Sequence, residues 1–241
     1  MAVWAIVPAA GIGARMNSDL PKQYLTLQGA SVIAHTLRRL AQLSSLSATV
    51  VALHPEDRYW SSHGPELREG LMTCTGGQER ALSVLNGLHA LAGLAQDEDW
   101  VLVHDAVRPC VRVSDIEAML EELAAHSVGG LLGVPVSSTL KLANANRDVV
   151  TTLPRDDMWQ ASTPQAFRYG LLREVLEQAI ARGELVTDEA GAMELAGYSP
   201  RLVRGNADNI KITYPEDLAM ADVILRAQAQ EMEDATTADG Y

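Results

Sequence analysis

The stretch WAIVPAAGIGARM, at residues 4–16, joins an apolar run to two glycines and a cationic side chain. Gly11 and Gly13 leave the backbone uncovered, and Arg15 follows them. A second cation, Lys22, comes shortly afterwards in LPKQYL. A glycine loop exposes backbone N–H groups, and an arginine with a lysine adds positive charge, so the stretch suits a triphosphate. The alternative is a tight turn between a strand and a helix, with a basic pair in solvent.

The stretch does not match two common nucleotide-binding fingerprints. The GxGxxG pattern fails because Met16 occupies the place of its third glycine, and residues 31–35, SVIAH, supply no acid for a ribose. The GxxxxGK[ST] pattern of P-loops is not met either. The sequence therefore disfavours a dehydrogenase and a P-loop enzyme.

Two more charged residues lie in or after apolar runs. Asp105 ends VLVHDA, where a carboxylate can hold a divalent metal such as magnesium that bridges phosphate oxygens; the alternative is a turn acid. Lys211, between two apolar residues in DNIKIT, is costly there unless it faces an anion or a carboxylate. His104 has no partner cysteine or histidine and is interpreted as structural. Arg108 could pair with Asp105 or touch a substrate.

The segment GGQERALSV places two glycines and a polar run before an expected helix. Gly77, Gln78 and Ser83 could reach a base and a ribose, and Arg80 is either a nucleotide contact or a surface charge. The alternative is an ordinary loop that leads into a helix.

The elements that must position these residues alternate between strand and helix. Apolar runs predict strands at 3–9, 48–54, 100–106 and 129–136, and helical spacing predicts helices at 35–43, 81–91, 114–126, 169–182, 188–196 and 215–228. Ser114, with Glu117 three residues on, is expected to cap its helix, and Pro215 fits a first helical turn. The pattern predicts an α/β fold with a mostly parallel sheet and helices on both faces. Ligands of such sheets bind beyond the carboxyl ends of the strands, where PAAGIG and HDA fall.

Residues 137–158 break the alternation. TLKL and VVTTL flank the turn-rich ANANRD, which predicts a β-hairpin that could project as an arm. A free two-stranded hairpin is marginal in water, so we expect it to pack on a second subunit; an ordinary surface excursion is the alternative. Residues 1–226 are expected to form one domain, and the acidic segment 227–241 is expected to be disordered.

Composition limits the classes of function. The chain has 241 residues and a net charge of −12, which argues against a general nucleic-acid surface. The two cysteines, Cys74 and Cys110, form no CxxC pair, so a reducing cytoplasm is expected. No apolar run is long enough to predict a membrane span.

Several ordered motifs together carry a family resemblance. These are PAAGIGARM with PKQYL, GGQERALSVLNGL, VHDAVRPC, VPVSSTLK, WQASTPQAF, TDEAGAME and GNADNIKITYPEDL. From about residue 3 to 226 the chain resembles the 2-C-methyl-D-erythritol 4-phosphate cytidylyltransferases of the non-mevalonate isoprenoid pathway. The resemblance implies a Rossmann-like fold and a homodimer that exchanges a β-arm.

The resemblance also implies site residues and substrates. The substrates would be CTP and 2-C-methyl-D-erythritol 4-phosphate, with a divalent cation such as Mg²⁺ held by Asp105. The expected catalytic residues are Arg15, Lys22 and Lys211. The expected nucleotide contacts are Pro8, Ala9, Ala10, Gly11, Gly13, Gly77, Gln78, Arg80, Ser83 and Asp105. The expected acceptor contacts are Asp105, Arg108, Thr139, Arg155, Thr163, Thr187 and Lys211, and Thr187 also looks like an N-cap.

Two other functions remain open from the residues alone. One is a cytidylyltransferase for another polyol phosphate, such as ribitol 5-phosphate, which would share the nucleotide half of the site. The other is an inactive nucleotide-binding regulatory protein, disfavoured because a pure binder needs no full set of Arg15, Lys22, Asp105 and Lys211.

Overall fold

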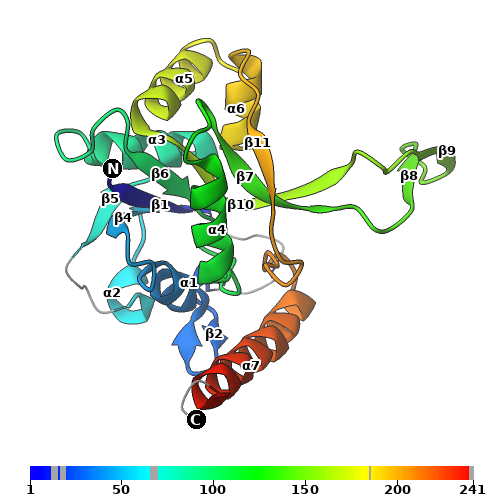
Figure 1. Cartoon of the computed structure of the whole chain (residues 1–241), viewed down its shortest axis with the longest axis horizontal. Helices are drawn as coiled ribbons and strands as arrows, with labels where there is room; N and C mark the ends of the chain where they lie inside the picture. The colour runs from blue at the N-terminus through cyan, green and yellow to red at the C-terminus, as the bar shows by residue number, and fades with distance from the viewer. Residues whose placement is uncertain (12–15, 17–19, 66–69, 185, 239–241) are drawn as a thin grey trace.

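A computed structural model describes residues 1–11, 16, 20–65, 70–184 and 186–238. Strands and helices alternate over most of this length (Figure 1). In chain order they are β1 (Val3–Ala9), η2 (Lys22–Tyr24), β2 (Thr26–Leu27), β3 (Ala30–Ser31), α1 (Val32–Leu40), β4 (Leu46–Leu53), α2 (Trp60–His63), β5 (Leu71–Thr75), α3 (Arg80–Ala90), β6 (Trp100–Val103), α4 (Val113–Leu123), β7 (Gly129–Pro135), β8 (Leu140–Ala143), β9 (Val149–Leu153), β10 (Trp159–Arg168), α5 (Tyr169–Ala181), α6 (Glu189–Leu195), β11 (Arg201–Arg204) and α7 (Pro215–Ala238).

In the described part of the chain, seven strands form the central sheet in the order β11-β7-β10-β6-β1-β4-β5. β1 runs parallel to β4 and β6, and β4 runs parallel to β5. β10 runs antiparallel to β6 and β7. The predicted α/β fold with a mostly parallel sheet is therefore confirmed, and β10 is its antiparallel member.

Alternation along β1 explains why both faces of the sheet are covered. Val3, Ala5 and Val7 pack in one apolar cluster with α1 and α4, whereas Ile6 packs in the other cluster with α3, α5 and α6. Successive side chains of a strand point to opposite faces, so a continuous apolar run fits a strand buried on both sides. The helices therefore lie in two layers that hold the strand ends in register.

The N-terminal boundary of α4 differs from the prediction. The helix begins at Val113, Arg112 is its N-cap, and no side chain caps it. The prediction that Ser114 is the cap is wrong, because Ser114 lies inside the first turn. The first residue of α7 is Pro215, which confirms the expected place of that proline.

The acidic segment after residue 226 also differs from the prediction, because α7 continues through Ala238. Gln228 is buried and donates to the Cys110 carbonyl at 2.9 Å. Arg112 pairs with Glu231 at 2.6 Å between Nη1 and Oε2. These contacts stabilise a helix across the predicted boundary at 226/227; residues 239–241 lie outside the described residues.

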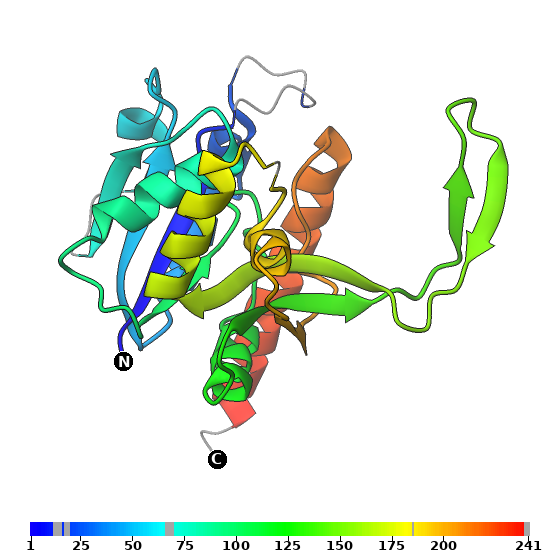
Figure 2. The same cartoon turned by 90° about the horizontal axis from the view of Figure 1, so that it is seen from above.

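The predicted hairpin is present as the pair β8–β9, which extends away from the sheet and its helices (Figures 1 and 2). The turn between its strands is closed by Asn144, whose Oδ1 accepts from the backbone of Asn146 and Asp148, each at 2.9 Å. Val149 and Val150 are about 60% exposed. The arm therefore presents exposed apolar side chains away from the sheet and its helices.

Three strands of the central sheet, β5, β10 and β11, were not predicted. β10 contains Pro164, and its pairing with β7 shifts register between Ala161 and Gln165, so WQASTPQAF lacks a regular alternation. No helix within the described ranges has both the length and the apolar character needed to cross a membrane.

Candidate functional site

A pocket of about 190 Å³ lies beyond the carboxyl ends of β1 and β6. Segments far apart in the sequence form its walls. The predicted residues that line it are Pro8, Ala9, Ala10, Gly11, Lys22, Gly77, Gln78, Arg80, Ser83, Asp105 and Lys211. The structure therefore brings most of the expected nucleotide contacts together; Gly13 and Arg15 fall outside the described residues.

The wall that follows β1 is held by a residue that the sequence did not single out. Gln23 is buried, and its Nε2 donates to the carbonyls of Ala9 at 2.8 Å and Gly11 at 3.2 Å. Lys22, directly before it, donates from Nζ to the Ile212 carbonyl at 3.0 Å. The short helix η2 therefore holds the backbone of Ala9 and Gly11 and also contacts the segment of Lys211.

The opposite wall is a glycine turn braced by Ser83. The Ser83 hydroxyl accepts from the Gly77 N–H at 3.0 Å and donates to the Glu79 carbonyl at 3.2 Å. Ser83 is only 2% exposed, so its hydroxyl shapes the turn that lines the pocket. The first residue of α3 is Arg80, which carries its side chain from this turn toward β6.

Gly77→Ala is expected to lower the melting temperature. An added Cβ would lie 2.3 Å from Leu82 Cβ, so the turn must shift. Overpacking of this kind costs about 1–3 kcal/mol, or roughly 2–12 °C in a chain of this size. Gly11→Ala is the matched control, because a Cβ there meets no atom of the described residues within 4 Å. Equal melting temperatures of the two variants would contradict this account of the turn.

Asp105 is the centre of a cluster of charges. Its Oδ1 lies 3.3 Å from Arg80 Nε, and its Oδ2 lies 3.3 Å from Arg108 Nε and 2.9 Å from Lys211 Nζ. Burial opposes ionisation, but the attraction of the three cations, that of Arg80 first, outweighs it and holds the pKa of Asp105 well below its usual value. The carboxylate stays charged and fixes the cations at the pocket.

Lys211 differs from the expectation in its local structure. The segment after Asn209 is not a strand, and the Lys211 side chain is 41% exposed. It does face a carboxylate, that of Asp105. Lys211 therefore has one side in solvent and lines the pocket, an arrangement that permits contact with an anionic ligand.

Thr163 and His104 form a buried hydrogen-bond chain behind Asp105. Thr163 Oγ1 accepts from the Asp105 N–H at 3.0 Å and lies 3.0 Å from His104 Nδ1. Burial lowers the pKa of His104 to about 4, so the ring is neutral near pH 7. These contacts agree with a structural role for His104 and place the Thr163 hydroxyl against the backbone.

Three of the expected acceptor contacts lie elsewhere. Thr139 and Arg155 flank the arm and are exposed, and Arg155 donates to the Ser137 carbonyl. Thr187 is exposed in the turn before α6, but the N-cap is Asp188, whose side chain accepts from the Gly191 N–H at 2.9 Å. The expectation that Thr187 is the cap is therefore wrong.

Glu189 is a second residue that the sequence did not single out. It is 1% exposed and pairs with Arg80, with 2.5 Å between Nη1 and Oε1. An acid in the first turn of a helix is usually an exposed partner of the helix dipole. The sequence TDEAGAME therefore did not indicate that Glu189 forms a buried ion pair with Arg80, 109 positions away.

The side chains that line the pocket suit a magnesium ion only if substrate phosphates supply further oxygen ligands. Among the residues that the structure describes, no group of three His, Cys, Asp or Glu side chains could hold a metal. Magnesium usually takes one or two carboxylates and completes its shell with water and substrate phosphates. Asp105, a single buried carboxylate in the pocket, fits that pattern.

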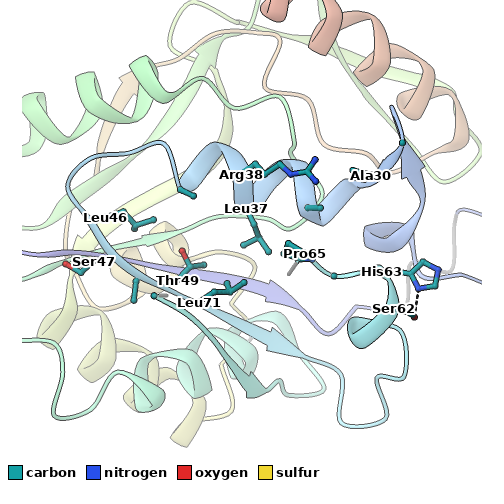
Figure 3. Close-up of a pocket in the computed structure, with 16 residues that line it drawn as sticks. Ala30, Leu37, Arg38, Leu46, Ser47, Thr49, Ser62, His63, Pro65 and Leu71 are labelled. Carbon is teal, nitrogen blue, oxygen red and sulfur yellow. Dashed lines mark hydrogen bonds between the residues drawn. The ribbon is translucent and has the colours of Figure 1, made fainter. Parts of the chain in front are cut away.

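Two much larger cavities contain none of the residues expected at the nucleotide site. One, of about 760 Å³, lies between α1 and β4 and includes Arg38 and His63 in its lining (Figure 3). The other, of about 950 Å³, lies at the base of the arm, between Ser137 and Trp159. Neither combines a glycine loop with a buried charge cluster.

Comparison with known proteins adds independent findings. The profile of the IspD family, 2-C-methyl-D-erythritol 4-phosphate cytidylyltransferase, matches residues 3–227. The curated protein of that name from Dechloromonas aromatica is 52% identical over 227 residues, which are 93% of this chain and 98% of the relative. The one from Hahella chejuensis is 46% identical over 231 residues, 96% of each chain.

Solved structures agree with these sequence matches. The 2-C-methyl-D-erythritol 4-phosphate cytidylyltransferase of Francisella tularensis has 35% identity and a TM-score of 0.82, over 93% of this chain and all of that one. A crystal structure of 4-diphosphocytidyl-2C-methyl-D-erythritol synthase has 34% identity and a TM-score of 0.81. The profile match, the sequence identities and the shared fold lead to one conclusion: the chain belongs to the 2-C-methyl-D-erythritol 4-phosphate cytidylyltransferase family.

Proposed function

We propose that the chain transfers a cytidylyl group from CTP to 2-C-methyl-D-erythritol 4-phosphate. The products are 4-diphosphocytidyl-2-C-methyl-D-erythritol and pyrophosphate. The observation that carries the proposal is the family match over residues 3–227, since it spans the glycine loop, the Asp105 cluster and Lys211 in one chain. An acceptor phosphate oxygen bonds to the α-phosphorus of CTP, and the bond from that phosphorus to the oxygen of the β-phosphate breaks.

Positioning and charge account for most of the catalysis in this proposal. Two anions must meet, and the transition state at the α-phosphorus carries extra negative charge. Lys22 and Lys211 both line the pocket and stabilise that charge, and Arg15 joins them because it follows the glycine loop in the sequence. The backbone of residues 8–11 and the turn at Gly77 bind the nucleotide, while Arg80 contacts it from the start of α3.

Asp105 has two tasks in the proposal. It holds Arg80, Arg108 and Lys211 in place, and it binds a divalent cation next to the triphosphate. Such a cation would be held by Asp105 and would neutralise part of the charge of the phosphates.

Asp105→Asn is expected to lower turnover and to weaken the response to magnesium. A neutral amide is a poorer ligand for a hard cation, so the half-saturating magnesium concentration should rise by about tenfold or more. The measurement is pyrophosphate release in a magnesium titration. Superimposable titration curves for the variant and the parent would place the metal elsewhere.

The acceptor half of the site combines residues from two copies of the chain. Arg108 and Lys211, which pair with Asp105, take the acceptor side together with Thr163 of β10. Thr187 would reach the acceptor from the exposed turn before α6. Thr139 and Arg155 come from the arm of a second subunit in a homodimer. The support for this dimer is that the arm projects from the sheet (Figure 2) and exposes Leu142, Val149 and Val150.

A panel of acceptors tests the proposed function. Pyrophosphate release is measured with CTP, magnesium and either 2-C-methyl-D-erythritol 4-phosphate, ribitol 5-phosphate or no acceptor. Release with the first acceptor alone is the expected result. Release with ribitol 5-phosphate alone would identify a different polyol phosphate enzyme, and binding of CTP without release would identify a regulatory protein.

A further inference from the structure

Arg80 lies between two carboxylates, and Glu189 accepts from both of its terminal nitrogens. Glu189 Oε1 is 2.5 Å from Arg80 Nη1, and its Oε2 is 3.1 Å from Nη2. Only Nε is directed to Asp105, at 3.3 Å from Oδ1. Arg80 lines the pocket, whereas Glu189 lies behind it and is 1% exposed.

The backbone around Glu189 is itself fixed. Gln165 of β10 is 1% exposed, donates from Nε2 to Asp188 Oδ2 at 2.9 Å and accepts from the Ala190 N–H at 2.8 Å. The same strand carries Thr163, whose hydroxyl accepts from the Asp105 N–H. Both carboxylates that flank Arg80 are therefore anchored to β10.

We propose that Glu189 is a positioning residue for nucleotide binding, which sets the plane of the Arg80 guanidinium and keeps it from closing onto Asp105. This inference rests on the proposed function, because it concerns the pocket for the nucleoside triphosphate. A planar guanidinium held at both terminal nitrogens has little rotational freedom. Arg80 can then contact an anionic ligand without losing entropy on binding.

The charge of Glu189, and not only its shape, is needed for this role. In Glu189→Gln the amide NH₂ would face a guanidinium N–H, donor against donor. Arg80 would then turn its fork to Asp105, the remaining carboxylate. Arg80 would then be withdrawn from the nucleotide.

The test compares Glu189→Gln, Arg80→Lys and the double variant with the parent chain. The dissociation constant for CTP is measured by calorimetry, and KM and kcat by pyrophosphate release. Glu189→Gln is expected to weaken CTP binding by about 10- to 100-fold, the worth of a hydrogen bond to a charged group. KM for the acceptor is expected to change by less than about threefold, because Glu189 acts through Arg80.

The double variant separates positioning from general stability. Arg80→Lys keeps the charge but loses the fork, so Glu189→Gln should add no further loss of CTP affinity in that background. Asp99→Asn is the control: Asp99 accepts from Ala2 N–H and Gln96 N–H at the start of β6. It should lower the melting temperature and leave CTP binding unchanged.

Three outcomes would overturn the inference. The first is that Glu189→Gln binds CTP with an affinity within about twofold of that of the parent. The second is that the losses of CTP affinity from the two single substitutions multiply in the double variant. If Glu189→Gln does not fold, Glu189→Asp is measured instead, because it keeps the charge but shortens the side chain. CTP affinity equal to that of the parent in Glu189→Asp is the third outcome. An inactive parent that binds CTP would count against the proposed function and leave this test intact.

Discussion

Lys22→Ala is expected to lower kcat by about 10²–10³, the usual cost of removing one charged group that stabilises a developing negative charge. Lys22 lines the pocket beside the glycine loop. Its ammonium group donates to the Ile212 carbonyl, next to Lys211. Loss of that charge acts on the transition state more than on bound CTP, so KM for CTP should change much less than kcat.

A fold-level effect must be separated from the catalytic one. Lys22 donates to the Ile212 carbonyl, so the melting curve of Lys22→Ala is measured together with its rate. Arg226→Ala is the matched control, since Arg226 is 73% exposed and pairs with Asp222 on α7. Normal turnover with an unchanged melting curve in Lys22→Ala would remove Lys22 from the mechanism.

Mixing two inactive variants is expected to restore activity if the arm is exchanged between subunits. In the proposed dimer, Arg155→Ala removes a bidentate phosphate contact that lysine could not replace, and Lys22→Ala disables the other half of the site. In a mixed dimer, one site would contain both Arg155 and Lys22, and the other would contain neither. Random pairing makes about half of the dimers mixed, so roughly a quarter of parental activity should return.

The measurement is pyrophosphate release after co-expression, with the mixed dimers identified by mass. Each variant refolded alone is the control, and both should remain inactive. Lack of recovery in confirmed mixed dimers would mean that Arg155 serves the site of its own subunit. Arg155 would then have to approach that site by a movement of the arm.

Local sequence patterns were sufficient for the elements that approach the pocket. The apolar run of β1 and the glycines after it predicted a buried strand followed by an open loop, and VLVHDA predicted Asp105 beyond the end of β6. These predictions depend on residues close together in sequence. The hairpin of the arm was predictable for the same reason, since ANANRD is a local turn signal.

Contacts between distant segments could not be predicted in the same way. Glu189 and Arg80 are 109 positions apart, and Gln23 acts on carbonyls that any residue could supply. The acidic composition after residue 226 indicated disorder. Composition alone does not reveal that Glu231 pairs with Arg112, which lies far away in the sequence. β10 was missed because Pro164 and a register shift interrupt its alternation.

An isotope experiment tests the central claim most directly, that an acceptor phosphate attacks the α-phosphorus of CTP. 2-C-methyl-D-erythritol 4-phosphate labelled with oxygen-18 at the terminal oxygens of its phosphate is incubated with the chain, CTP and magnesium. Mass spectrometry then follows the label. The account predicts that all of it stays in the cytidylyl product and that the pyrophosphate is unlabelled. Label in the pyrophosphate, or release of CMP without a linked product, would contradict the account.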